Sequence, residues 1–190
     1  MIEVNRKTKE TDIKIMLNPY GNGIYNIHTG IPFLNHMLEA FSKHAHIDLD
    51  ISCIGDLEID NHHTVEDIGL VLGEAFHKAI YPIQNIERFG NATVLMDEAS
   101  ISCDIDISNR SFLFYEVPIG GKVGDFEVEL VEEFLKSFSS KFGITIHLVY
   151  NRGKNKHHII EASFKALAVS LRRAILINKN ANIPSTKGTI

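Results

Sequence analysis

A short motif occurs twice in this chain of 190 residues and constrains its fold more than any other feature. Two adjacent histidines precede a glutamate in NHHTVED (61–67) and again in KHHIIEA (156–162). The likeness extends past the motif, since HHTVEDIGLVLGEAFHKAI aligns without gaps on HHIIEASFKALAVSLRRAI with six identities. Upstream, FLNHMLEAFSKHAHIDLDI aligns on LVEEFLKSFSSKFGITIHL at an offset of 97 residues. The sequence therefore predicts a tandem repeat of one structural unit.

Hydrophobic periodicity predicts the content of each unit. Alternating apolar residues are typical of half-buried strands, and apolar residues at helical spacing are typical of amphipathic helices. Read in this way, residues 2–82 and 91–177 each give the series strand, strand, strand, helix, strand, helix. We therefore expect an α+β fold in which two β-β-β-α-β-α units stack a four-helix layer against mixed β-sheets. We also expect this stacking to bring the two HHxxE helices together about a pseudo-twofold axis.

Length and composition suit one soluble domain of two pseudo-symmetric halves, about 1–90 and 91–180. The net charge of -5 gives no basic stripe for nucleic acid, and the apolar stretches are too short to span a membrane. The N-terminal residues show no secretory signal pattern. Cys53 and Cys103 lie in strand-like segments, where we expect buried thiols and no disulfide framework. These features together predict a cytoplasmic protein.

The repeated histidines and glutamates are candidate metal ligands. On a helix, Glu66 shares a face with His62 and with His63, while the two histidines point about 100° apart. One helix start can thus supply two metal sites, and the second copy does the same with His157, His158 and Glu161. Imidazole and carboxylate without thiolate favour Mn, Fe, Co or Zn. The alternative is an ordinary helix start, with Asn61 or Asn155 as the N-cap.

Two further polar pairs follow from the repeat. His36 in the first helix of one unit aligns with Glu133 in the first helix of the other, and both residue types bind metals. Glu10 aligns with Glu98 at an offset of 88 residues, which places both at corresponding strand turns. The repeat therefore duplicates polar positions as well as the core.

The segments GIPFLNHML, GDLEIDNHHTVEDIGLVLG, NKHHIIEASFKALA and PSTKG together resemble the imidazoleglycerol-phosphate dehydratase family over essentially the whole chain. The resemblance implies two similar α+β halves with a four-helix layer. It implies dehydration of imidazole glycerol phosphate to imidazole acetol phosphate in histidine biosynthesis. It further implies two manganese ions per active site, and an assembly of twenty-four subunits with active sites at subunit interfaces.

The resemblance also assigns site residues. Glu10, acting from a neighbouring subunit, is the expected proton-transfer residue, and Asp97 is expected to meet a ring nitrogen of the substrate. The implied metal ligands are His36, His62, His63, Glu66, His157, His158 and Glu161, with Glu133 as an eighth position where many members have histidine. The implied phosphate-binding residues are Arg88, Arg110, Ser185 and Lys187, the last two in a C-terminal tail, 181–190.

This chain departs from the family pattern near the phosphate-binding residues as well. It has Thr186 within the tail motif, and it has Asn109 and Ser111 beside Arg110 where a Gly-Arg-Pro pattern is common. Two other functions use the same ligand types. A dinuclear metal-dependent phosphoester hydrolase is one alternative, and a metal-storage or metal-sensing protein, which needs no phosphate-binding arginines, is the other.

Overall fold

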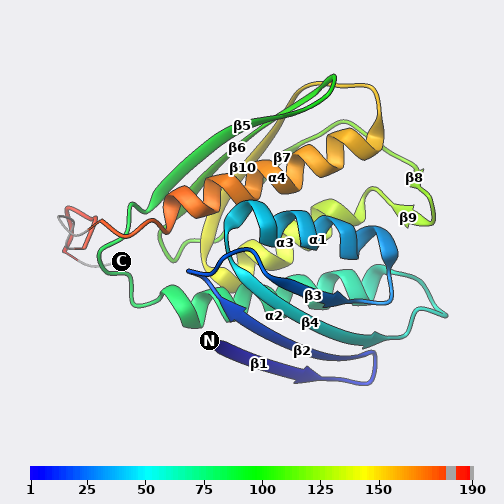
Figure 1. Cartoon of the computed structure of the whole chain (residues 1–190), viewed down its shortest axis with the longest axis horizontal. Helices are drawn as coiled ribbons and strands as arrows, with labels where there is room; N and C mark the ends of the chain where they lie inside the picture. The colour runs from blue at the N-terminus through cyan, green and yellow to red at the C-terminus, as the bar shows by residue number, and fades with distance from the viewer. Residues whose placement is uncertain (179–182, 189–190) are drawn as a thin grey trace.

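The computed structural model describes residues 1–178 and 183–188 and shows two β-sheets enclosing a layer of helices (Figure 1). The first half contains β1 (Ile2–Lys7), β2 (Thr11–Asn18), β3 (Tyr25–His28), α1 (Pro32–Ala45), β4 (Asp48–Gly55) and α2 (His62–Ile80). The second half contains β5 (Phe89–Met96), β6 (Ala99–Ile107), β7 (Phe112–Glu116), α3 (Leu130–Phe142), β10 (Ile144–Arg152) and α4 (Lys156–Ala174). A small hairpin, β8 (Lys122–Val123) and β9 (Phe126–Glu127), is inserted before α3.

The two sheets have the same topology. Their strand orders are β1-β2-β4-β3 and β5-β6-β10-β7. In each sheet three strands pair antiparallel, and the last strand runs parallel to its neighbour, β3 along β4 and β7 along β10. Both sheets are therefore mixed, and the predicted α+β repeat is confirmed, with the β8–β9 hairpin as an addition to the second half.

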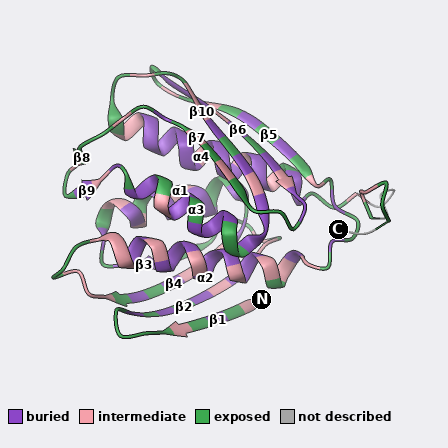
Figure 2. Cartoon of the chain, turned by 180° about the vertical axis from the view of Figure 1, so that it is seen from behind, coloured by how far each residue is buried: buried purple, intermediate pink, exposed green. Residues whose placement is uncertain are grey.

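The core lies between each sheet and the helices, as the burial pattern in Figure 2 shows. Alternate residues of the strands point inward, and phenylalanines fill the helix layer, where Phe76 packs edge-on against Phe41 and Phe138. Cys53 and Cys103 are free and buried, as predicted. Burial raises the pKa of the Cys53 thiol to about 11 and that of Cys103 to about 12, so both stay protonated near neutral pH.

Helices from different halves pack in pairs, α1 against α4 and α2 against α3. Helices α2 and α3 approach each other closely at Gly69, which has no side chain. A Cβ atom added there would lie only 2.7 Å from the Phe134 carbonyl oxygen. Figure 1 shows α1 and α3 between α4 and α2. The expectation that the two HHxxE helices pack on each other is therefore wrong, because each pairs with the first helix of the opposite half. None of the helices in the described residues has the length and apolar character needed to cross a bilayer.

Candidate active site

The two motif helices begin in different ways. At α4 the side chain of Asn155 caps the helix, accepting hydrogen bonds from the backbone N–H groups of His157 (2.9 Å) and His158 (3.5 Å). At α2 the N-cap residue, Asn61, makes no side-chain cap hydrogen bond, and the carboxylate of the preceding Asp60 accepts from the His62 N–H (2.7 Å). Both asparagines occupy the predicted N-cap positions, but only Asn155 caps its helix through its side chain. Capping engages backbone groups, so in both helices the imidazoles remain available for other contacts.

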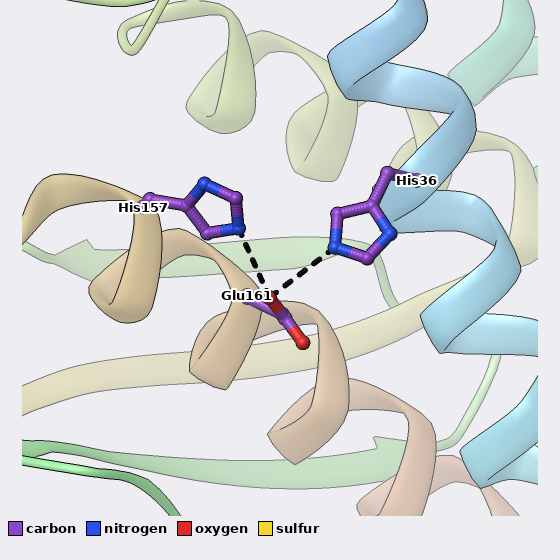
Figure 3. Close-up of side chains that lie close together, drawn as sticks. All are labelled: His36, His157 and Glu161. Atoms are coloured by element: carbon purple, nitrogen blue, oxygen red, sulfur yellow. Dashed lines mark hydrogen bonds and ion pairs between the residues drawn. The ribbon is translucent and has the colours of Figure 1, made fainter.

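Three predicted ligands converge between α1 and α4 (Figure 3). The Nε2 atoms of His36 and His157 lie 3.3 and 3.1 Å from the same carboxylate oxygen, Oε2 of Glu161. Glu161 is buried, while both imidazoles are about half exposed. Metal–ligand bonds of about 2.1 Å at tetrahedral or octahedral angles put neighbouring ligand atoms roughly 3.0 to 3.4 Å apart. The two histidine–carboxylate distances match this spacing, so the three side chains form a group that could hold a metal ion.

The second oxygen of Glu161 has its own partner, which the sequence did not single out. Lys165, one turn further along α4, donates to Oε1 at 2.7 Å. Burial raises the pKa of Glu161, but the hydrogen bond from Lys165 and the nearby cations outweigh burial, so the pKa is lowered overall. Lys165 thus holds the carboxylate ionised and directs Oε2 toward the histidines. The spacing of four residues between Glu161 and Lys165 is the sequence feature that could have predicted this ion pair on a helix.

The pseudo-equivalent group on α2 and α3 is more open. His62 Nε2 lies 3.8 Å from Glu66 Oε2, and the Glu133 carboxylate lies 3.8 Å from Lys136 Nζ. Among the described residues, one group of metal-ligating side chains converges within 4.8 Å, and it consists of His36, His157 and Glu161. Glu133 occupies the helix position that matches His36, but its carboxylate does not join such a group.

The remaining two histidines of the motifs face acidic side chains at the strand turns. Nδ1 of His63 lies 2.9 Å from Asp56, and Nε2 of the same ring lies 3.9 Å from Glu10. Nδ1 of His158 lies 2.8 Å from Glu98, and its Nε2 lies 3.9 Å from Asp97.

These contacts shift the pKa values of the groups involved. The hydrogen bond to Asp56 raises the pKa of His63, and the hydrogen bond to Glu98 raises the pKa of His158. Hydrogen bonds from the Asn155 backbone and from His158 lower the pKa of Glu98 to about 2, so Glu98 is ionised near neutral pH. The two predicted catalytic carboxylates, Glu10 and Asp97, thus each lie 3.9 Å from the Nε2 atom of a predicted metal ligand, although Glu98, not Asp97, is the residue that aligns with Glu10.

The predicted phosphate-binding residues gather at the other end of α4. Arg88 and Arg110 line a cavity of about 810 Å³ together with Phe89 and residues 183–187 of the tail. Both guanidinium groups donate to Asp106, Arg88 through Nε at 2.7 Å and Arg110 through Nη2 at 3.2 Å. The two arginines, which share the Asp106 carboxylate, and Lys187 thus supply three cations to the lining of the cavity. The excess positive charge suits an anionic group such as phosphate.

Backbone geometry at this cavity accounts for one departure from the family pattern. Asn109 adopts a left-handed conformation with φ of 56°, a region that glycine and asparagine tolerate best. Its backbone N–H donates to the Tyr81 hydroxyl at 2.7 Å. The carbonyl of Pro184 accepts from Arg88 at 2.8 Å, which ties the tail to the cavity. Positions 181, 182, 189 and 190 of the predicted tail lie outside the described residues.

Fold and site together define a class of protein, a duplicated α+β enzyme with histidine–carboxylate groups at its helix starts and a separate cationic cavity. The model of the imidazoleglycerol-phosphate dehydratase family matches residues 29–171. Relatives of that name from Sulfurovum sp. and Aliarcobacter butzleri are 67% and 62% identical to this chain, each over 100% of both sequences. The chain belongs to the imidazoleglycerol-phosphate dehydratase family and is an enzyme of histidine biosynthesis.

Solved structures of the family support the same assignment. The dehydratase from Pyrococcus furiosus matches with a TM-score of 0.87 and 37% identity, covering 98% of this chain and 100% of that one. The dehydratase from Staphylococcus aureus matches with a TM-score of 0.83 and 35% identity, covering 93% of this chain and 99% of that one. The duplicated fold described above is therefore shared with these enzymes.

Proposed function

We propose that this enzyme converts imidazole glycerol phosphate to imidazole acetol phosphate in a metal-dependent dehydration, with two manganese ions in each active site. The single observation that carries the metal dependence is the convergence of His36 and His157 on one oxygen of Glu161. Imidazole nitrogen and carboxylate oxygen together suit manganese, although other divalent transition metals accept the same ligands. The remaining proposed ligands are His62, His63, Glu66, His158 and Glu133.

The distance between the metal group and the cationic cavity supports an active site shared between subunits. Glu161 lies in the first turns of α4, whereas the backbone N–H of Arg88 donates to the carbonyl of Ala174 at the end of the same helix. Ala174 lies thirteen positions after Glu161 on this helix, which corresponds to a rise of about 20 Å. In the substrate, three carbons join the imidazole to the phosphate group. This three-carbon linker is too short to bridge the two sites of one subunit.

We therefore propose that the protein acts as a homo-oligomer, with a complete active site formed by the metal group of one subunit and the cationic cavity of another. Twenty-four subunits is the number implied by the resemblance to the family. His63 and His158, whose rings contact acidic side chains at the strand turns, would ligate metal together with residues of a neighbouring subunit. We further place the enzyme in the cytoplasm, where its two buried thiols would remain reduced.

The proposed chemistry removes a proton from one substrate carbon and hydroxide from the next. A bound divalent ion would supply a Lewis acid that withdraws electron density from the substrate imidazole. Arg88, Arg110, Ser185 and Lys187 would hold the phosphate group. Glu10, whose carboxylate is about half exposed, would accept the carbon-bound proton as a general base.

The hydroxide leaves first, and Glu10 then takes the proton from the neighbouring carbon. Transfer of this proton to the hydroxide gives water and returns Glu10 to its carboxylate form, and the enol that remains becomes the ketone of the product. Asp97 would accept a hydrogen bond from a ring nitrogen of the substrate during these steps. Its carboxylate is largely exposed, at 80%, and is therefore accessible to a ligand.

The assay that tests this proposal incubates the purified protein with Mn²⁺ and imidazole glycerol phosphate, and measures both imidazole acetol phosphate and inorganic phosphate. The proposal predicts the acetol product, its loss on chelation and its recovery when Mn²⁺ is restored. Release of inorganic phosphate without the acetol product would instead support a dinuclear phosphoester hydrolase. Formation of the acetol product at full rate after complete chelation would contradict the metal dependence.

A further inference from the structure

Two carboxylates contact the motif histidines on the nitrogen that faces away from Glu10 and Asp97. Asp56 Oδ2 lies 2.9 Å from His63 Nδ1, and Glu98 Oε2 lies 2.8 Å from His158 Nδ1. These carboxylates are not equivalent in the repeat, because Asp56 directly follows β4 whereas Glu98 lies in the β5–β6 turn and aligns with Glu10. The two halves thus place a carboxylate on the histidine Nδ1 from different positions of the repeat. Such a contact is not simply copied with the repeated unit, which indicates that it has a role of its own.

An ionised carboxylate only accepts hydrogen bonds, so each contact requires a proton on Nδ1 of the histidine. In a neutral imidazole the other nitrogen, Nε2, then carries the lone pair. We propose that Asp56 and Glu98 are positioning residues that hold His63 and His158 in the tautomer whose Nε2 binds a metal ion. This inference rests on the proposed function only in that His63 and His158 are taken as metal ligands. Outer-shell carboxylates have this effect in many metal sites.

The two carboxylates differ in how they are themselves held. Glu98 Oε1 accepts hydrogen bonds from the backbone N–H groups of Lys154 (3.0 Å) and Asn155 (2.8 Å), immediately before α4. Its Oε2 is therefore directed at His158. Asp56 has no such anchor on its side chain, because its Oδ1 is buried and makes no hydrogen bond within the described part of the chain.

This difference predicts opposite results for the same formal change. In Glu98→Gln the amide oxygen has to stay on the two backbone N–H groups, because an NH₂ group there would face two donors. The NH₂ group then points at His158 Nδ1, which has to accept, and the ring proton moves to Nε2. In Asp56→Asn the amide can turn so that its oxygen still accepts from His63 Nδ1–H. His158 therefore changes tautomer in the first variant, whereas His63 keeps its tautomer in the second.

The test is solid-state NMR of the full-length, metal-free protein labelled with ¹⁵N-histidine, at about pH 8, where free imidazole is neutral. The NMR signals of His63 and His158 are assigned as the signals that disappear in the variants His63→Gln and His158→Gln, respectively. Wild type is expected to show both rings protonated at Nδ1. Glu98→Gln is expected to show His158 protonated at Nε2, while the neighbouring control Asp97→Asn keeps His158 protonated at Nδ1.

Equilibrium dialysis against Mn²⁺ provides the second readout. Glu98→Gln is expected to lower the affinity of one class of sites about 10- to 100-fold, and Asp56→Asn to lower it less. Retention of the Nδ1 proton on His158 in folded Glu98→Gln would overturn the proposal, and so would equal loss of affinity in both variants. If the wild-type protein binds no Mn²⁺ and forms no product, the proposed function is refuted instead. The tautomers of the metal-free protein would still show whether Asp56 and Glu98 hold His63 and His158 protonated at Nδ1.

Discussion

Replacing Glu161 by glutamine removes the negative charge on which His36 and His157 converge in the proposed metal site. In the metal-free protein, Glu161 is buried and accepts from Lys165 Nζ at 2.7 Å, and Lys165 is only 21% exposed. A hydrogen bond between charged and largely buried partners contributes about 1.5 to 3 kcal/mol, and the variant leaves the Lys165 ammonium without an ionised partner. We therefore expect Glu161→Gln to lower the free energy of unfolding by about 2 kcal/mol.

The chain contains a matched control for this change. Glu74 and Lys78 form another i,i+4 pair, at 2.6 Å on α2, but both side chains are at least 40% exposed. Exposed helix pairs contribute about 0.3 to 0.5 kcal/mol, so Glu74→Gln should be nearly neutral. Urea unfolding of both variants without metal, at pH 7 and one protein concentration, measures the difference. Equal losses in the two variants would refute the view that the Glu161–Lys165 contact is a strong, buried one.

The same comparison has a defined pH dependence. The pKa of Glu161 in the folded protein is lowered from its ordinary value of 4.5. The stabilisation from its carboxylate is therefore fully present above about 4.5 and is lost as the pH falls through the lowered pKa. The difference between wild type and Glu161→Gln should shrink in acid. Isothermal titration with Mn²⁺ at pH 7 should in addition show loss of one class of binding sites in Glu161→Gln and none in Glu74→Gln.

Three further predictions concern the cavity turn, the helix pair and metal binding. Asn109→Ala should lower the free energy of unfolding by about 1 to 2 kcal/mol because φ is 56° there, whereas Asn109→Gly should be tolerated; equal losses in urea unfolding would contradict this. Gly69→Ala should cost about 1 to 3 kcal/mol, seen as a lower Tm, because its Cβ would meet the Phe134 carbonyl; an unchanged Tm would refute this packing argument. Bound Mn²⁺ should fall as the pH drops below about 6.5, because histidine ligates metal only when neutral; constant occupancy down to about pH 5 would argue against histidine ligands.

The repeat allowed most of the fold to be predicted from the sequence. Helical and strand periodicities identified both units, because each element has one buried face. Periodicity could not identify the β8–β9 hairpin, whose strands have two residues each. Sequence also misjudged which helices pack together. That choice depends on close approaches such as the one at Gly69, where the missing side chain admits the Phe134 backbone.

The candidate site was predictable in its residue types and less so in its contacts. The roles of Lys165 and Asp56 depend on where side chains meet between and along elements, and neither residue belongs to the repeated motif. Asn61 illustrates the same limit, because its amide contacts Glu127 of the hairpin at 3.2 Å and does not cap α2. The alignment of Glu10 with Glu98 correctly placed both at strand turns. However, Glu98 contacts a histidine Nδ1, whereas Glu10 lies near an Nε2.

The central claim is a metal-dependent dehydratase whose active site combines the metal group of one subunit with the cationic cavity of another. Co-expression of Glu161→Gln subunits with Arg88→Ala subunits, each carrying a different affinity tag, tests this claim most directly. Each variant alone should form little imidazole acetol phosphate in Mn²⁺. The mixed oligomer, isolated through both tags, should recover about a quarter of wild-type activity, because sites between suitable subunits contain neither substitution. Mixed oligomers as inactive as either variant would contradict the shared site.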